Sequence, residues 1–284
     1  NIHFTPEKNW NNDPNGLIYI DGIWHLYYQN NPNDVVWGPM HWGHAVSKDL
    51  IHWEHLPVAL YPDEIGTMYS GSMAYDENNT SGFAKYGEKP MVAVYTAHNM
   101  ETGLEQQCIA YSLDQGKHFE KYYGNPVIKN PGTPDFRDPR VFWNDKKDCW
   151  SLVLASGDHA EFYASQDLKN WKKSQLLTLK DCWECPDLRR IPMEGGGEKW
   201  VFWSADGYYF LGEFDGYEFK TDGVKLEAYR TKIPYAAQTF WGTEDVITIP
   251  WLRTKNKGKL YTGVMGIPRK LILAKTLEGL RLRQ

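Results

Sequence analysis

A unit that recurs along the chain constrains its fold more than any other feature. Each copy consists of a short strand-like run, an Asp-containing turn and an aromatic residue that begins the next run. Three copies begin at Ser47, Ser112 and Ser165, and a looser copy begins at Glu213. These starts lie 65, 53 and 48 residues apart, a period typical of propeller blades and longer than that of sandwich hairpins. With the segment 235–273 as a further unit, the sequence predicts five blades.

The rest of the pattern also favours strands. Short alternating or aromatic-rich runs are bounded by Asp-Gly, Asn-Asp, Gly-Gly or Pro, and helical periodicity is almost absent. The runs 17–20 and 23–29 flank Asp21-Gly22, which is a strong hairpin signal. Aromatic residues make up 15% of the chain, which suits strands and also suits a surface that stacks on sugar rings. We therefore expect an all-β chain that forms a five-bladed β-propeller.

The charge of the chain excludes some classes of partner. A net charge of −5 without a long basic run argues against nucleic acid or an anionic membrane and favours a neutral, hydroxylated substrate. No apolar run approaches the roughly 20 residues that span a bilayer, so we expect a soluble protein. The chain starts at Asn1 without Met, and an N-terminal segment could have been removed. The compartment, cytoplasmic or secreted, and the oligomeric state stay open.

The four cysteines do not form a recognisable metal site. Cys182 and Cys185 have C-x-x-C spacing, but no second pair or histidine cluster completes a zinc site and no βαβ pattern supports a redox motif. The other two are Cys108 and Cys149. We expect free, mostly buried thiols and no metal.

An acid followed by a proline precedes a strand at three places in the chain. Asp13-Pro14-Asn15-Gly16 alone has the sequence of a turn. Asp138-Pro139 and Glu184-Cys185-Pro186 repeat the arrangement. Each acid comes before the first hairpin of a repeat unit, where the strand that lines the central channel should lie. Counting to the same position in the other units predicts five residues around one funnel: Asp13, Ser70, Asp138, Glu184 and Gln238.

Three carboxyl groups in one pocket repel one another and lose hydration, so the arrangement indicates chemistry more than turn capping. Glycoside hydrolysis uses one ionised and one protonated carboxyl. Glu184 has the most apolar sequence neighbours, which predicts a raised pKa and the proton-donor role. Asp13 follows Asn11 and Asn12, which should keep it ionised as a nucleophile. Asp138 could be held by Arg137, although adjacent strand residues normally point to opposite faces.

Three motifs resemble those of glycoside hydrolase family 32, the β-fructofuranosidases that include invertases, levanases and inulinases. They are Trp10 to Gly16, Phe136 to Pro139 and Trp183 to Leu188, in that order. Further matches are Tyr28-Gln29, Trp37 to His44, Tyr69 to Ser72, Tyr235 to Phe240 and Ile267 to Arg269.

The resemblance implies a five-bladed propeller and a retaining double displacement on terminal β-D-fructofuranosyl residues of sucrose, inulin or levan. Asp13 would be the nucleophile, Glu184 the general acid and base, and Asp138 the transition-state stabiliser. No metal or organic cofactor is implied, and the partner is a fructoside. The implied substrate-binding residues are Asn12, Gln29, Trp37, Tyr69, Ser70, Arg137 and Trp251.

Two departures from the family pattern carry expectations. Asn11 replaces a usual Met, which predicts reduced stability or a shifted pocket edge. Family members normally continue into a C-terminal β-sandwich, whereas this sequence ends at Gln284. We expect a propeller over 1–274 and a tail over 275–284 that resembles the start of a linker to an absent sandwich. The chain is then either a propeller-only form or a fragment.

Three alternatives to a β-fructoside hydrolase remain. The same fructosyl-enzyme could pass its sugar to another sugar, which would make the protein a fructosyltransferase. A non-catalytic fructan-binding propeller is disfavoured because it has little reason to keep three costly carboxyl groups. A related five-bladed glycosidase acting on arabinose or xylose is disfavoured by the first and third motifs.

Overall fold

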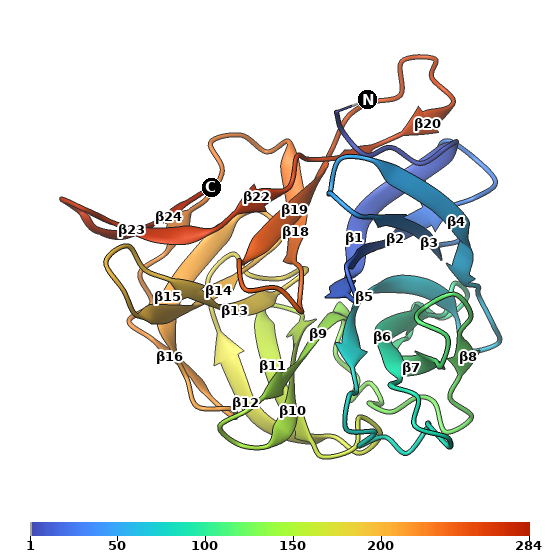
Figure 1. Ribbon diagram of the computed structural model, residues 1–284, viewed down its shortest axis with the longest axis horizontal. Coiled ribbons are helices and arrows are strands. Elements are labelled where there is room, and N and C mark those ends of the chain that lie inside the picture. The colour runs from blue at the N-terminus through green and yellow to red at the C-terminus, as the bar shows by residue number, and fades with distance from the viewer. Residues whose placement is uncertain (1) are drawn as a thin grey trace.

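The computed structural model of the protein describes residues 2–284, and every regular element in that range is a β-strand. The strands form five antiparallel sheets around a central axis, and the chain passes from one sheet to the next in sequence order (Figure 1). The structure therefore confirms the predicted five-bladed β-propeller. No helix in the described range is long and apolar enough to cross a membrane.

Each blade takes its strands from one continuous stretch of sequence. Blade 1 contains β1 (Asn9–Ile20), β2 (Ile23–Asn31), β3 (His41–Ser47) and β4 (Trp53–Leu60). Blade 2 contains β5 (Thr67–Tyr75), β6 (Met91–His98), β7 (Glu105–Ser112) and β8 (Glu120–Lys121). Blade 3 contains β9 (Phe136–Asn144), β10 (Cys149–Ser156), β11 (His159–Ser165) and β12 (Lys172–Thr178).

The last two blades are less regular. Blade 4 contains β13 (Asp187–Pro192), β14 (Glu198–Trp203), β15 (Tyr208–Phe214) and β16 (Phe219–Thr221), with β17 (Leu226–Glu227) also on β15. Blade 5 contains β18 (Pro234–Thr239) and β19 (Ile247–Leu252), with β21 (Val264–Met265) and β22 (Arg269–Lys270) on β19. The remaining strands are β20 (Tyr261–Thr262), β23 (Ile272–Thr276) and β24 (Gly279–Arg283).

The repeated Asp turn joins the third and fourth strands of blades 1 to 4, as the sequence predicted. Asp49 accepts backbone hydrogen bonds from residues 51 and 52 at 2.9 and 2.8 Å. Asp167 and Asp215 accept the same pair of bonds in blades 3 and 4. In each turn the carboxylate replaces the ladder hydrogen bonds that the reversing chain cannot make.

The apolar core lies between neighbouring blades. Tyr27 and Trp42 of blade 1 pack with Tyr95 of blade 2, and all three are at most 1% exposed. Because each sheet is covered on both faces, central strands such as β6 are mostly apolar and are buried along almost their whole length. The stacked blades leave a central channel, and the innermost strands line it.

Blade 1 closes the ring by pairing with the C-terminal part of the chain. β1 pairs in parallel with β20, and the backbone N–H of Trp241 donates to the carbonyl of Leu17. Asn11 is fully buried, and with its amide nitrogen as donor it bonds the carbonyls of Thr262 at 2.9 Å and Gly263 at 2.7 Å. Asn11 therefore has a polar role in ring closure that the sequence did not reveal.

Strands β23 and β24 form a hairpin that packs on blade 4. Leu273 bridges to Met193, and the backbone N–H of Leu282 donates to the hydroxyl of Tyr209 at 3.0 Å. The predicted boundary after residue 274 falls within β23. The division into a propeller and a linker stays a prediction.

Candidate active site

The inner strands of four blades are interrupted at the same place by a β-bulge, where two residues lie opposite one. A bulge turns a side chain away from the ordinary alternation and often lies beside a functional site. This shared irregularity explains why Asp13 and Asp138 occupy equivalent positions in the sequence. In these bulges Asn12-Asp13 lie opposite Gln29, Tyr69-Ser70 opposite Thr96, Asp138-Pro139 opposite Leu154, and Ala236-Ala237 opposite Pro250.

Blades 4 and 5 depart from the predicted set of five funnel residues. Glu184 lies in the loop before β13, and the backbone N–H of Ala205 donates to its carbonyl at 2.9 Å. Gln238 lies beyond the bulge of blade 5, where its side chain is buried and donates to the carbonyl of Gly71 at 3.0 Å. The prediction that Gln238 faces the funnel is therefore wrong. Blade 5 contributes Tyr235 and Trp251 instead.

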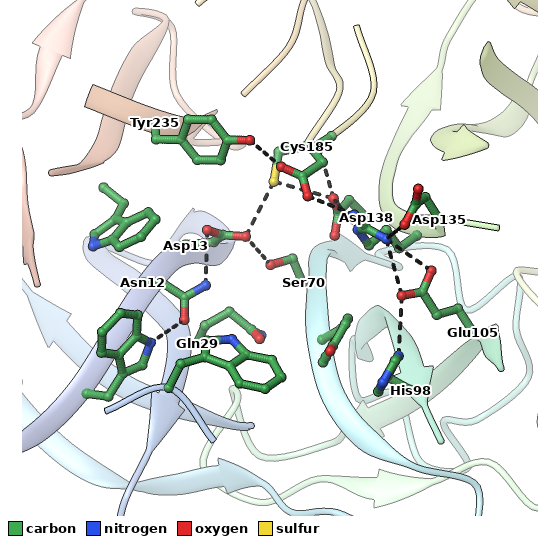
Figure 2. Close-up of a pocket in the computed structure, with 16 residues that line it drawn as sticks. Asn12, Asp13, Gln29, Ser70, His98, Glu105, Asp135, Asp138, Cys185 and Tyr235 are labelled. Atoms are coloured by element: carbon green, nitrogen blue, oxygen red, sulfur yellow. Dashed lines mark hydrogen bonds and ion pairs between the residues drawn. The ribbon is translucent and has the colours of Figure 1, made fainter. Parts of the chain in front are cut away.

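A cavity of about 450 Å³ opens at this end of the channel, and all ten predicted site residues line it (Figure 2). They come from blades 1, 2 and 3, from the loop before blade 4 and from blade 5. The sequence analysis did not assign six further lining residues. Three of these, Trp10, Cys185 and Tyr235, lay within motifs already noted, whereas the other three carried no sequence signal: His98, Glu105 and Asp135.

Asp13 accepts hydrogen bonds from polar groups, but its carboxyl is largely desolvated. Ser70 Oγ donates to Asp13 Oδ2 at 2.6 Å, and Asn12 Nδ2 donates to Oδ1 at 3.1 Å. Burial raises the pKa of Asp13, the bonds from Ser70 and Asn12 oppose that rise, and the charge of Glu184 adds to it. The expected polar neighbours are present, although burial has the larger effect on the pKa of Asp13. That Asp13 is ionised as a nucleophile stays a prediction.

Asp138 faces the same cavity as Arg137, contrary to the strand rule. Its φ of 64° lies in the left-handed region, so the two neighbours do not alternate between faces. Asp138 Oδ2 accepts the backbone N–H of Cys185 at 2.9 Å and lies 4.0 Å from Arg137 Nε. Burial, opposed by Arg137 and reinforced by Asp13 and Glu184, raises the pKa of Asp138 to about 7.

Glu184 lies between two hydrogen-bond donors. Arg137 Nη2 donates to Oε1 at 2.7 Å, and the Tyr235 hydroxyl donates to Oε2. The Glu184 side chain is 30% exposed, and its neighbour Trp183 is 44% exposed and not part of the cavity lining. The prediction that Glu184 has the most apolar surroundings is therefore wrong, because sequence neighbours do not surround this loop side chain in space.

Arg137 links the carboxyl groups on this side of the cavity. Besides Glu184, its guanidinium contacts Asp135 at 2.6 Å and Glu105 at 3.3 Å (Figure 2). Glu105 is 5% exposed and is also 3.3 Å from His98 Nδ1. The guanidinium is thus fixed by several carboxylates, which holds it beside both Glu184 and Asp138.

Aromatic side chains form two walls of the cavity. On one side Tyr69 stacks on His98 at 4.3 Å and meets Trp37 edge-on at 6.2 Å. On the other side Trp251 lies edge-on to Trp10 at 6.1 Å and to Tyr235 at 6.2 Å. Aromatic faces beside hydrogen-bonding carboxyls suit a sugar, whose rings present both C–H and O–H groups.

The four cysteines are free and buried, as the sequence predicted. Within residues 2–284, no group of three or more His, Cys, Asp or Glu side chains is placed to hold a metal ion. The Cys185 thiol lies 3.3 Å from Asp13 Oδ2 and 3.4 Å from Asp138 Oδ2, so it packs between these two carboxyls.

The fold and the site together define a class: five-bladed β-propellers whose channel mouth holds three carboxyls, an arginine and aromatic walls. Glycoside hydrolysis uses a pair of carboxyl groups, which this site contains. The sequence profile of the glycosyl hydrolases family 32 N-terminal domain matches residues 3–284. The chain belongs to this family.

Individual relatives agree with this assignment. A levanase from Bacillus subtilis is 43% identical over 99% of this chain and 46% of its own length. An invertase from Debaryomyces hansenii is 43% identical over 88% of this chain and 51% of its own length. The crystal structure of an exo-inulinase from Aspergillus awamori superposes with a TM-score of 0.92 at 35% identity, covering 99% of this chain and 65% of that one. The chain thus spans about half the length of the curated relatives it matches.

Proposed function

We propose that the protein is a retaining β-fructosidase that hydrolyses terminal β-D-fructofuranosyl residues by double displacement. One observation carries the proposal: Asp13, Asp138 and Glu184 converge on one cavity from three separate parts of the chain, with Arg137 beside two of them. Burying three carboxyl groups together is unfavourable for folding, which favours a functional reason for the arrangement. All three groups line a cavity that a sugar can fill.

Asp13 is the proposed nucleophile. Its bonds from Ser70 and Asn12 stabilise the carboxylate form and fix the carboxylate plane. Attack of one Asp13 oxygen on the anomeric carbon breaks the bond to the leaving oxygen and gives a fructosyl-enzyme ester. Water then attacks the anomeric carbon from the face that the leaving group vacated and displaces the Asp13 carboxylate, so the product keeps its anomeric configuration.

Glu184 is the proposed acid in the first step and base in the second. It protonates the leaving oxygen and later removes a proton from water, and Arg137 and Tyr235 hold its two oxygens in place. Asp138, steadied by the Cys185 backbone, is placed to accept hydrogen bonds from sugar hydroxyls and to stabilise positive charge on the ring.

The names of the relatives, levanase, invertase and exo-inulinase, support fructosides as the substrate class. We propose sucrose, inulin and levan as substrates. The wall of Trp37, Tyr69 and His98 and the opposite wall of Trp10, Trp251 and Tyr235 would contact the sugars, while Asn12 and Gln29 lie at the blade 1 side.

A product assay on sucrose, inulin and levan tests the proposal with Asp13→Ala and Glu184→Ala. Each variant should lose activity by several orders of magnitude, because neither step has a substitute for its missing group. Glu244→Ala, which removes an exposed acid outside the cavity, should match the parent. The assignment fails if Asp13→Ala or Glu184→Ala retains the parent's rate.

Methanol as acceptor tests the stereochemistry. A fructosyl-enzyme intercepted by methanol gives methyl β-D-fructofuranoside, which proton NMR distinguishes from the α anomer. Formation of the α anomer would contradict the retaining mechanism. In concentrated sucrose, predominant formation of longer oligosaccharides instead of free fructose would favour the alternative fructosyltransferase.

A further inference from the structure

A second, smaller cavity lies at the opposite end of β9 from Asp138. Its volume is about 80 Å³, and its walls include Trp143, Arg189, Trp200 and Trp241. This volume is far below the roughly 300 Å³ of the smallest typical pockets for organic ligands. It has room for a small ion or a few waters and not for a sugar.

Arg189 is a buried cation without an ion-pair partner. Its side chain is 8% exposed, and among residues 2–284 no carboxylate lies within 4.0 Å of its guanidinium. Its one hydrogen bond runs from Nη2 to the carbonyl of Phe240 at 3.2 Å. Arg190, the next residue, is paired with Glu198 at 2.9 Å, so the two arginines differ although they are adjacent.

The nearest buried carboxylate is already engaged. Asp187 Oδ1 lies 2.9 Å from Arg140 Nε, and Oδ2 accepts both the backbone N–H and the hydroxyl of Thr239. This part of the core therefore holds two buried guanidinium groups, those of Arg140 and Arg189, against one carboxylate. Burial and the charge of Arg140 lower the pKa of Arg189 to about 9, so the group stays charged at neutral pH.

Two hydrogen-bond donors at this cavity lack acceptors. Arg189 Nε and Trp241 Nε1 are both buried without a partner. The guanidinium of Arg189 lies 3.6 Å above the ring of Trp241, which in turn stacks on Phe142 at 5.4 Å. An unpaired donor in the interior is unfavourable, and two beside one unpaired charge call for an acceptor that is itself negative.

We infer that this cavity binds a small oxyanion, such as inorganic phosphate, beside the stacked pair of Arg189 and Trp241. The rim of the cavity also carries Lys146 and Asp145, and Arg190 at the rim is already paired with Glu198. Phe142, Arg189 and Trp241 belong to blades 3, 4 and 5, and the anion would hold these three blades together. This inference does not depend on the proposed activity.

Thermal unfolding with sodium phosphate against sodium chloride at equal ionic strength and pH 7 tests the inference. Phosphate at ten times its Kd should raise the Tm of the parent by about 3 °C in a saturable manner. Arg189→Met keeps an apolar stack on Trp241 and should lose the rise. Arg283→Met, which removes an exposed arginine paired with Glu194, should keep it.

Indole NMR gives an independent readout. Phosphate should shift one of the 13 tryptophan Nε1–H resonances, and Trp241→Phe identifies that resonance by its absence. No saturable rise in Tm, an equal rise with chloride, or an unchanged rise in Arg189→Met would each overturn the inference. Should Arg189→Met fail to fold, the parent's indole titration decides, and an unmoved Trp241 resonance rejects the site.

Discussion

At the scale of single residues, Asp138 is the carboxyl whose ionisation the fold opposes most clearly. Its pKa is raised to about 7, whereas the unfolded chain has a value near 3.8. The folded state therefore holds a proton that the unfolded state has lost between these two values. It follows that this group's contribution to stability falls as pH rises from about 4 to about 7.

Asp138→Asn should remove that penalty. At pH 8 the variant should be more stable than the parent by roughly 2–4 kcal/mol, and the difference should shrink toward pH 4. Urea unfolding of the parent and the variant at a series of pH values measures this difference in the free energy of unfolding. The converse result, a parent more stable than the variant at pH 8, would show that the ion pair with Arg137 outweighs burial. Activity should nevertheless fall, since stability and function conflict at this position.

At the scale of secondary-structure elements, Asn11 joins β1 to the end of β20 and the residue that follows it. Asn11→Met should leave the carbonyls of Thr262 and Gly263 buried without a donor. We expect the free energy of unfolding to fall by about 2–4 kcal/mol. Urea denaturation checks this, with Asn33→Met as the matched exposed control. If Asn11→Met is as stable as the parent, the amide does not fasten the ring.

The sequence predicted the blades better than it predicted the environment of the acids. Asp49 and its counterparts end strands through hydrogen bonds to residues two and three positions further on, so the repeat can be predicted from the local sequence. The position of Asp13 and Asp138 also follows from the repeat. The surroundings of Glu184 do not, because Arg137 and Tyr235 reach it from other blades.

The same limit explains the other misjudged residues. Gln238 was placed by counting, and counting cannot show that the bulge of blade 5 falls on Ala236 and Ala237. Glu105 and His98 carried no motif because their function depends on contact with Arg137 and Tyr69, which are distant in sequence. Contacts between residues so far apart in the sequence produce no periodic pattern in it.

At the scale of the whole molecule, the coupled carboxyls should set the pH range of activity. Burial raises the pKa of Asp13, so the proposed nucleophile takes up a proton in acid. Asp138, whose pKa is raised to about 7, loses its proton as the pH rises through that value and adds a negative charge beside Asp13 and Glu184. We expect kcat/KM on sucrose to fall above about pH 7 and to fall again in acid. A profile flat from pH 6 to pH 9 would contradict this coupling.

The pairing of β1 with β20 also governs when the protein can become complete. Residues 9 and 10 pair with residues 261 and 262, so almost the whole chain must exist before the ring can close. Contacts so distant in sequence form slowly. Asp13 lies on β1, which completes its pairing only when the ring closes. Blades 2 to 4 can form earlier, because their strands pair with neighbours in the sequence. We therefore expect the pocket that holds Asp13 to assemble late in folding, after a stage in which this proposed nucleophile is exposed to solvent.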